Sequence, residues 1–180
     1  MRKDGILVKA PFTPEMKKTH TILVPQMLPI HFDMIAQVLQ QDGYKVEVLK
    51  TNHKGIADEG LRSVHNDTCY PALLVIGRFI EALKSGKYDL DHTALMITQT
   101  GGGCRASNYI HLLRKALRKA GFPQVLVASL NLYGLEKDSG FKFTVPMIRK
   151  DIAACIVCDE VMCPANQNRP ITIIPGEPVA

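Results

Sequence analysis

Cysteines offer the most versatile chemistry in this chain, and Cys104 stands in the most suggestive setting. It is preceded by Gly101-Gly102-Gly103, between an expected strand and an expected helix. Three glycines let the backbone adopt positive φ and approach a ligand closely, and a first helical turn offers unpaired N–H groups. The helix dipole and Arg105 favour a thiolate at Cys104, which is the form that ligates metals or attacks substrates. A phosphate-binding loop is a weaker interpretation, because the lysine of that motif is absent.

Cys69 repeats this arrangement at a second expected helix start. It follows the cap-type residues Asn66-Asp67-Thr68 and precedes Pro71, which the first turn of a helix tolerates. A buried, inert thiol is the alternative for either cysteine alone, because free cysteine is among the most buried residue types. His65, four residues earlier, is a candidate for tuning Cys69 or acting as an acid; the alternative is an ordinary surface histidine.

Cys155 and Cys158 form a Cys-x-x-Cys pair, and Cys163 follows. The spacing is typical of metal or redox motifs, but helical periodicity places Cys155 on an apolar stripe, so core packing is the favoured interpretation. The pair also lacks the strand-to-helix setting of a thioredoxin-type site. A structural zinc ion would need a fourth ligand, and no His or Cys follows Cys163.

Composition indicates an ordinary globular domain. The chain has 180 residues, of which 46% are hydrophobic and 22% charged, and this length can bury a core without disulfides. An odd number of cysteines and no export signal indicate thiols or metal ligands in the cytoplasm. The basic residues Arg114, Lys115, Arg118 and Lys119 indicate either a patch for an acidic partner or CoA-type phosphate, or a solvated helix face. Nucleic-acid binding is not expected, since Trp is absent and aromatics are only 6%.

Apolar periodicity predicts strands that alternate with helices. Strands are expected at Thr21–Pro25, Lys45–Leu49, Thr93–Thr98 and 125–130, and helices at 30–41, 57–64, 71–85, 106–120 and 145–162. This order predicts an α/β fold, an open and mostly parallel sheet with helices on both faces. We expect an N-terminal extension over 1–20, the α/β domain over 21–162 and a Pro-rich tail over 163–180. Ligands of such sheets bind beyond the carboxyl ends of the strands, where Cys104 is expected.

Three segments resemble a known family. They are 65–72 (His-Asn-Asp-Thr-Cys-Tyr-Pro-Ala), 86–88 (Gly-Lys-Tyr) and 98–109 (Thr-Gln-Thr-Gly-Gly-Gly-Cys-Arg-Ala-Ser-Asn-Tyr). In this order they resemble the large acyl-CoA dehydratase activase-related proteins, in the portion similar to 2-hydroxyglutaryl-CoA dehydratase subunits. The resemblance extends over residues 11–162.

The resemblance implies a Rossmann-like domain with a [4Fe-4S] cluster. The cluster would take an electron from an ATP-hydrolysing activase and pass it to a CoA thioester, so that an unactivated hydroxyl leaves through a ketyl radical. By motif match, Cys69 and Cys104 would be cluster ligands. Their hydrogen-bonding surroundings would include Asn66, Gln99, Gly102 and Gly103.

Two departures from the family shape this expectation. The relatives are far longer and carry nucleotide-binding activase domains, which nothing here resembles, so this chain is expected to be a fragment or subunit that does not hydrolyse ATP. A cluster usually has three or four protein thiolates, whereas only Cys69 and Cys104 match the family. The remaining thiolates would come from Cys155, Cys158, Cys163 or another subunit. We therefore expect a homo- or hetero-oligomer. The alternatives are a non-catalytic interaction or regulatory domain without a cluster, and a thiol-disulfide protein that uses Cys155 and Cys158.

Overall fold

The computed structural model describes residues 12–27, 29–65, 67–98, 108–130, 146, 147, 149 and 150. Its centre is a sheet of four parallel strands in the order β2-β1-β3-β4. The strands are β1 (Thr21–Pro25), β2 (Lys45–Leu49), β3 (Thr93–Thr98) and β4 (Leu126–Leu130). The predicted α/β fold with an open parallel sheet is thus confirmed.

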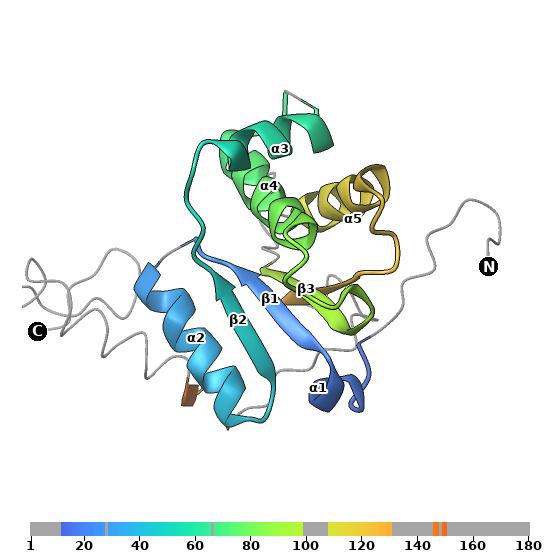
Figure 1. Ribbon diagram of the computed structural model, residues 1–180. Helices are drawn as coiled ribbons and strands as arrows, with labels where there is room; N and C mark the ends of the chain where they lie inside the picture. The colour runs from blue at the N-terminus through green and yellow to red at the C-terminus, as the bar shows by residue number, and fades with distance from the viewer. Residues whose placement is uncertain are drawn as a thin grey trace, which may run out of the picture.

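Helices cover both faces of this sheet (Figure 1). They are α1 (Met16–Thr19), α2 (Pro29–Gln41), α3 (Gly55–Ser63), α4 (Tyr70–Lys84) and α5 (Tyr109–Ala120), with a 3₁₀ turn, η1, at Leu90–His92. Helices α3, α4 and α5 lie on one side of the sheet, and α2 lies on the other. The arrangement confirms the predicted placement of helices on both faces of the sheet and is Rossmann-like.

Side-chain alternation along the strands divides the interior into two cores. Leu23 and Leu95 point towards α4 and α5, where they pack with Phe79 and Leu113. Their strand neighbours Ile22, Val24, Ala94 and Met96 point the opposite way, into the core that α2 covers. Both faces of each central strand are therefore buried, which explains why these strands are nearly continuous apolar runs.

Parallel pairing brings the carboxyl ends of all four strands to one edge of the sheet. From β1 the chain moves outward to β2, and it then returns to place β3 on the other side of β1. Strand order therefore reverses between β1 and β3, and such switch points are where open α/β sheets bind ligands. Helix α5 follows β3 and helix α4 follows β2 and α3, so both helices begin on the side of this edge.

Two glycines allow α3 and α4 to cross at very short range. A Cβ atom on Gly60 would overlap the carbonyl oxygen of Leu73, and a Cβ atom on Gly77 would overlap that of Ile56. The backbones of the two helices thus meet with no side chain between them. This contact anchors α3, which is only nine residues long, against the first half of α4.

The observed elements confirm the predicted strands and the predicted helices within the described ranges, with ends shifted by a few residues. Two short elements, α1 and η1, were not predicted. Of the predicted helix 145–162, residues 146, 147, 149 and 150 are helical and the rest lies outside the described residues. Phe12, in the segment interpreted as an N-terminal extension, is buried in the core under α2. Across the described ranges, no helix has the length and apolar character needed to span a membrane.

Candidate functional site

Cys69 is the N-cap residue of α4. Its backbone is extended (φ −58°, ψ 142°), and its carbonyl oxygen accepts the first helical hydrogen bond, from the amide of Leu73 at 3.2 Å. Thr68, one of the cap-type residues before it, plays a different part from the one expected: its amide donates to the His65 carbonyl in a turn that leads into the helix. Pro71 lies in the first turn, as predicted. The thiol thus stands at the positive end of the dipole of a 15-residue helix.

The sulfur of Cys69 lies against the start of the next helix. Its Sγ atom is 2.9 Å from the hydroxyl oxygen of Tyr109, the first residue of α5. Either group can donate while Cys69 is a thiol, whereas only the tyrosine hydroxyl can donate to a thiolate or to a metal-bound sulfur. The structure therefore brings together the two helix starts that the cysteine motifs singled out, although they are 40 residues apart.

A surface depression of about 310 Å³ opens beside this contact. It is lined by the turn before α4 and by the first turn of α5: His65, Asp67, Thr68, Cys69, Asn108 and Tyr109. Cys69 is half-buried, with one side packed against the core beneath α4 and α5. Residues distant in sequence thus supply apolar neighbours on that side of Cys69.

His65 shares the depression with Cys69 but bonds elsewhere. Its Nδ1 atom accepts from the Asp67 amide at 3.3 Å and lies 3.1 Å from a carboxylate oxygen of Asp67. The ring is largely exposed, with 76% of the side chain accessible. His65 therefore orders the turn that carries Cys69, and its predicted tuning of the thiol remains a prediction.

Several predicted site residues lie outside the described residues. They are Asn66, Gln99, Gly102, Gly103 and Cys104, together with Cys155, Cys158 and Cys163. The described ends of the glycine-rich segment are Thr98 at the end of β3 and Asn108 before α5. Within the described ranges, Cys69 is the only cysteine, and no three His, Cys, Asp or Glu side chains gather closely enough to hold a metal ion.

Tyr109 is a site residue to which the sequence analysis assigned no role. Helical spacing places it on the apolar face of α5, and its side chain is only 8% exposed. Its hydroxyl, however, reaches a buried polar position that spacing alone does not reveal. The residue type is the feature of the sequence that indicates this role, because a tyrosine buried at a helix start needs a hydrogen-bond partner for its hydroxyl.

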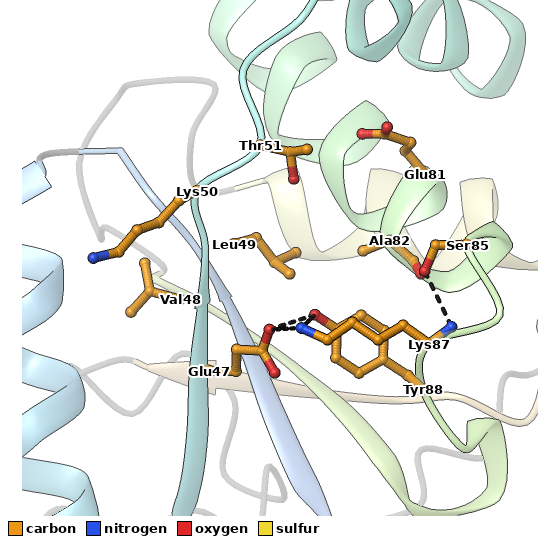
Figure 2. Close-up of a pocket in the computed structure, with 10 residues that line it drawn as sticks. All are labelled: Glu47, Val48, Leu49, Lys50, Thr51, Glu81, Ala82, Ser85, Lys87 and Tyr88. Atoms are coloured by element: carbon orange, nitrogen blue, oxygen red, sulfur yellow. Dashed lines mark hydrogen bonds and ion pairs between the residues drawn. The ribbon is translucent and has the colours of Figure 1, made fainter.

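A second depression, of about 450 Å³, lies between β2 and the end of α4 (Figure 2). Three of its polar residues bond to one another: Glu47 accepts from the Tyr88 hydroxyl at 2.7 Å and from the Lys87 ammonium group. Burial raises the pKa of Glu47, but the hydrogen bonds from Lys87 and Tyr88 outweigh this, so that its pKa lies below the ordinary value. The Gly86-Lys87-Tyr88 segment thus ties the end of α4 to the edge strand.

Among the described residues, two buried side-chain atoms lack a hydrogen-bond partner, Nε of Arg78 and Oε2 of Glu81. The other ends of the two side chains are bonded, Arg78 to the carbonyl of Gln26 and Glu81 to the ring of His53. Burial lowers the pKa of Arg78, while the carboxylate of Glu81 raises it. These groups position the loops after β1 and β2 relative to α4.

Comparison of the chain with models of protein families, with curated proteins and with solved structures gives no match. Fold and site alone therefore define the class: a Rossmann-like α/β domain with a half-buried cysteine at the start of α4, in contact with the start of α5.

Proposed function

We propose that this chain is an iron-sulfur component of a 2-hydroxyacyl-CoA dehydratase-like or activase-related system, in which it passes a low-potential electron to a CoA thioester. The observation that carries the proposal is the position of the Cys69 sulfur. It lines an open depression, beside the start of the helix that follows the Gly101-Gly102-Gly103-Cys104 segment. The fold supports the proposal less strongly, because Rossmann-like domains host many activities.

The described residues fit one corner of a [4Fe-4S] cluster. Cys69 would supply one thiolate, and the positive end of the α4 dipole favours negative charge at that position. Tyr109 would donate a hydrogen bond to the ligating sulfur. Such bonds, with burial and net charge, set the potential at which a cluster accepts an electron. When bound, the cluster would supply one-electron chemistry that no side chain of this domain provides.

Further ligands and partners follow from the resemblance. Cys104 would be the second thiolate, and Cys155, Cys158, Cys163 or a second subunit would supply the remainder. An activase domain or subunit would hydrolyse ATP and deliver the electron, in the cytoplasm. The chain would then act as a subunit of a lyase-type enzyme, within a homo- or hetero-oligomer.

The test is iron and acid-labile sulfide content, with an absorption spectrum, on protein purified without oxygen. We expect near-equal iron and sulfide and a broad band at roughly 400 nm, where thiolate-ligated clusters absorb. Cys69→Ser and Cys104→Ser should each lose most of the iron. Thr68→Ala, which alters the same depression without removing a thiolate, should keep it.

A wild-type protein that is folded, colourless and free of iron would overturn the cluster assignment. A reversible disulfide between Cys155 and Cys158 in that protein would then favour a thiol-disulfide function. Unchanged partner binding without either feature would favour an interaction or regulatory domain.

A further inference from the structure

The solvent-facing side of α5 carries basic residues and no acidic ones. Its apolar side, with Ile110, Leu113 and Leu117, is buried against the sheet. On the other side His111, Lys115, Arg118 and Lys119 are exposed; we call these four residues the α5 basic face. The sequence contains no Asp or Glu between Asp91 and Glu136, so no acidic residue of α5 itself offsets this charge.

Nearby carboxylates do not neutralise the α5 basic face either. Within the described ranges, Lys119 donates to the backbone carbonyl of Arg62, and no carboxylate pairs with Lys115 or Arg118. Elsewhere lysines do have acidic partners, such as Lys84 with Glu59 and Lys50 with Asp33.

Helical spacing adds like-charge repulsion between neighbouring turns, since Lys115 is three residues before Arg118 and four before Lys119. The helix dipole favours cations in the last turn, which accounts for Arg118 and Lys119 but not for Lys115. No charged partner among the described residues therefore accounts for Lys115 in the middle of the helix.

The α5 basic face lies on the helix whose first turn lines the Cys69 depression. Asn108, which lines that depression, shares an exposed stripe with His111, Lys115 and Arg118 at helical spacing. Lys115 lies six residues beyond Tyr109, or about 9 Å along the helix axis. Tyr70 follows Cys69 in the chain and exposes 64% of its surface. An exposed tyrosine is therefore the sequence neighbour of the cysteine, and the basic face lies on the helix whose first residue contacts the sulfur.

We propose that the α5 basic face, with Tyr70 as its apolar anchor, is the docking surface for an electron-donor protein that presents a carboxylate-rich surface. This inference rests on the proposed function, because it places the donor next to Cys69. Complementary charge raises the rate of encounter and fixes orientation, and exposed tyrosine and arginine are typical of the residues that dominate binding energy. A nucleic acid fits less well, since one exposed ring does not provide a series of stacking platforms.

The experiment uses a small acidic ferredoxin, in its oxidised form, as a probe that stands in for the carboxylate-rich surface of the donor. Its binding to the full chain is measured by isothermal titration at low and at physiological ionic strength. The docking variant is Lys115→Glu with Arg118→Glu. The matched control is Lys18→Glu with Lys45→Glu, which makes the same change in net charge at exposed positions on the amino edge of the sheet. Circular dichroism confirms that both variants are folded.

We expect the docking variant to weaken binding about tenfold or more at low ionic strength, and the control to weaken it by less than about twofold. Wild-type binding should weaken as salt is added. Tyr70→Ala should weaken binding at both ionic strengths. Equal losses in the docking variant and the control would overturn the proposal, because net charge alone would then explain binding. Tighter binding of a short DNA duplex than of ferredoxin would also overturn it.

Failure of docking and failure of the proposed function are distinguishable in this design. Binding is measured on the chain as purified and does not require a cluster, whereas iron and sulfide are measured separately on the same preparations. An iron-free chain overturns the proposed function, but the binding of the docking variant and of the control can still be compared. An iron-loaded chain with equal losses in both variants overturns the docking surface alone.

Discussion

The hydroxyl oxygen of Tyr109 lies 2.9 Å from the sulfur of Cys69, and this contact joins the first residue of α5 to the N-cap of α4. The chain between them passes through α4 and β3, so folding of the sheet is required to form the contact. Any group that Cys69 holds is therefore positioned by the same core packing that aligns the two helices.

Tyr109→Phe removes the hydroxyl and keeps the buried ring. In the iron-loaded protein we expect unchanged iron content and a lower reduction potential, because hydrogen bonds to a ligating sulfur stabilise the reduced cluster. If the bond is about 1 kcal/mol stronger in the reduced state, the shift is roughly 40 mV. Potentiometric titration followed by electron paramagnetic resonance measures it. Tyr88→Phe, distant from Cys69, should leave the potential unchanged; equal shifts in both variants would contradict the assignment.

Gly77→Ala tests the close crossing of α3 and α4. The added Cβ overlaps the carbonyl oxygen of Ile56, so the helices must separate. We expect a loss of about 2 kcal/mol or more in the free energy of unfolding, even though alanine has a better helix propensity by about 1 kcal/mol. Urea denaturation measures it.

Gly86→Ala is the matched comparison for Gly77→Ala. Gly86 has φ +72°, so alanine there is strained, but no atom lies within 4 Å of the added Cβ. The expected loss is about 1 kcal/mol, from backbone conformation alone. A smaller loss in Gly77→Ala than in Gly86→Ala would show that α3 moves freely against α4.

The lowered pKa of His20 predicts that the free energy of unfolding falls as the solution becomes mildly acidic. Burial lowers the pKa of His20 below its ordinary value of 6.5, as does the neighbouring His92, whose ring centroid is 5.5 Å away; Asp89 and a backbone hydrogen bond with Asp91 oppose them. The unfolded chain then binds more protons than the folded one below about pH 6.5. The contribution of neutral His20 to the free energy of unfolding is therefore fully present above pH 6.5. It is lost as the pH falls through the lower pKa that His20 has in the folded chain.

Urea denaturation across this pH range measures the effect, and His20→Gln should flatten the dependence. His111→Gln, at an exposed position on α5, is the control and should leave it unchanged. If stability depends on pH equally steeply in the wild type and in His20→Gln, another titrating group causes the dependence.

Local sequence patterns predicted most of the fold, because buried parallel strands are short apolar runs and the covering helices carry apolar stripes. Thr21–Pro25 and Thr93–Thr98 are such strands, and the structure places both at the predicted residues. The 3₁₀ turn at Leu90–His92 was missed because it depends on Asp89, whose carboxylate accepts from the Asp91 amide at 3.1 Å. A single side-chain cap has no periodicity by which to recognise it.

The candidate site was predictable in part. The residue types around Cys69 indicated a helix start, and the structure confirms one. Its contact with Tyr109 was not predictable, because it depends on how α4 and α5 pack on the same face of the sheet. Periodicity assigns a residue to a face of its own helix, whereas the identity of the opposite side chain depends on sheet order and register.

Glu47→Gln tests the connection between β2 and the end of α4. Glu47 accepts hydrogen bonds from Tyr88 and Lys87, which hold its pKa below the ordinary 4.5 despite the opposing effect of burial. A carboxylate with a lowered pKa contributes fully to stability above its unfolded value and loses that contribution as the pH falls through its folded value. At neutral pH we expect a loss of about 0.5–1 kcal/mol, since the pair is partly exposed and screened.

At a pH below the lowered folded pKa of Glu47, the wild type and Glu47→Gln should become nearly equal in stability, because the wild-type carboxyl is then protonated. Glu15→Gln, an exposed position in the turn before α1, should change stability little at either pH. Urea midpoints at both pH values, with unchanged m-values, measure the difference. A Glu47→Gln effect that persists undiminished at acid pH would assign the loss to packing in the depression of Figure 2 rather than to the charge of Glu47.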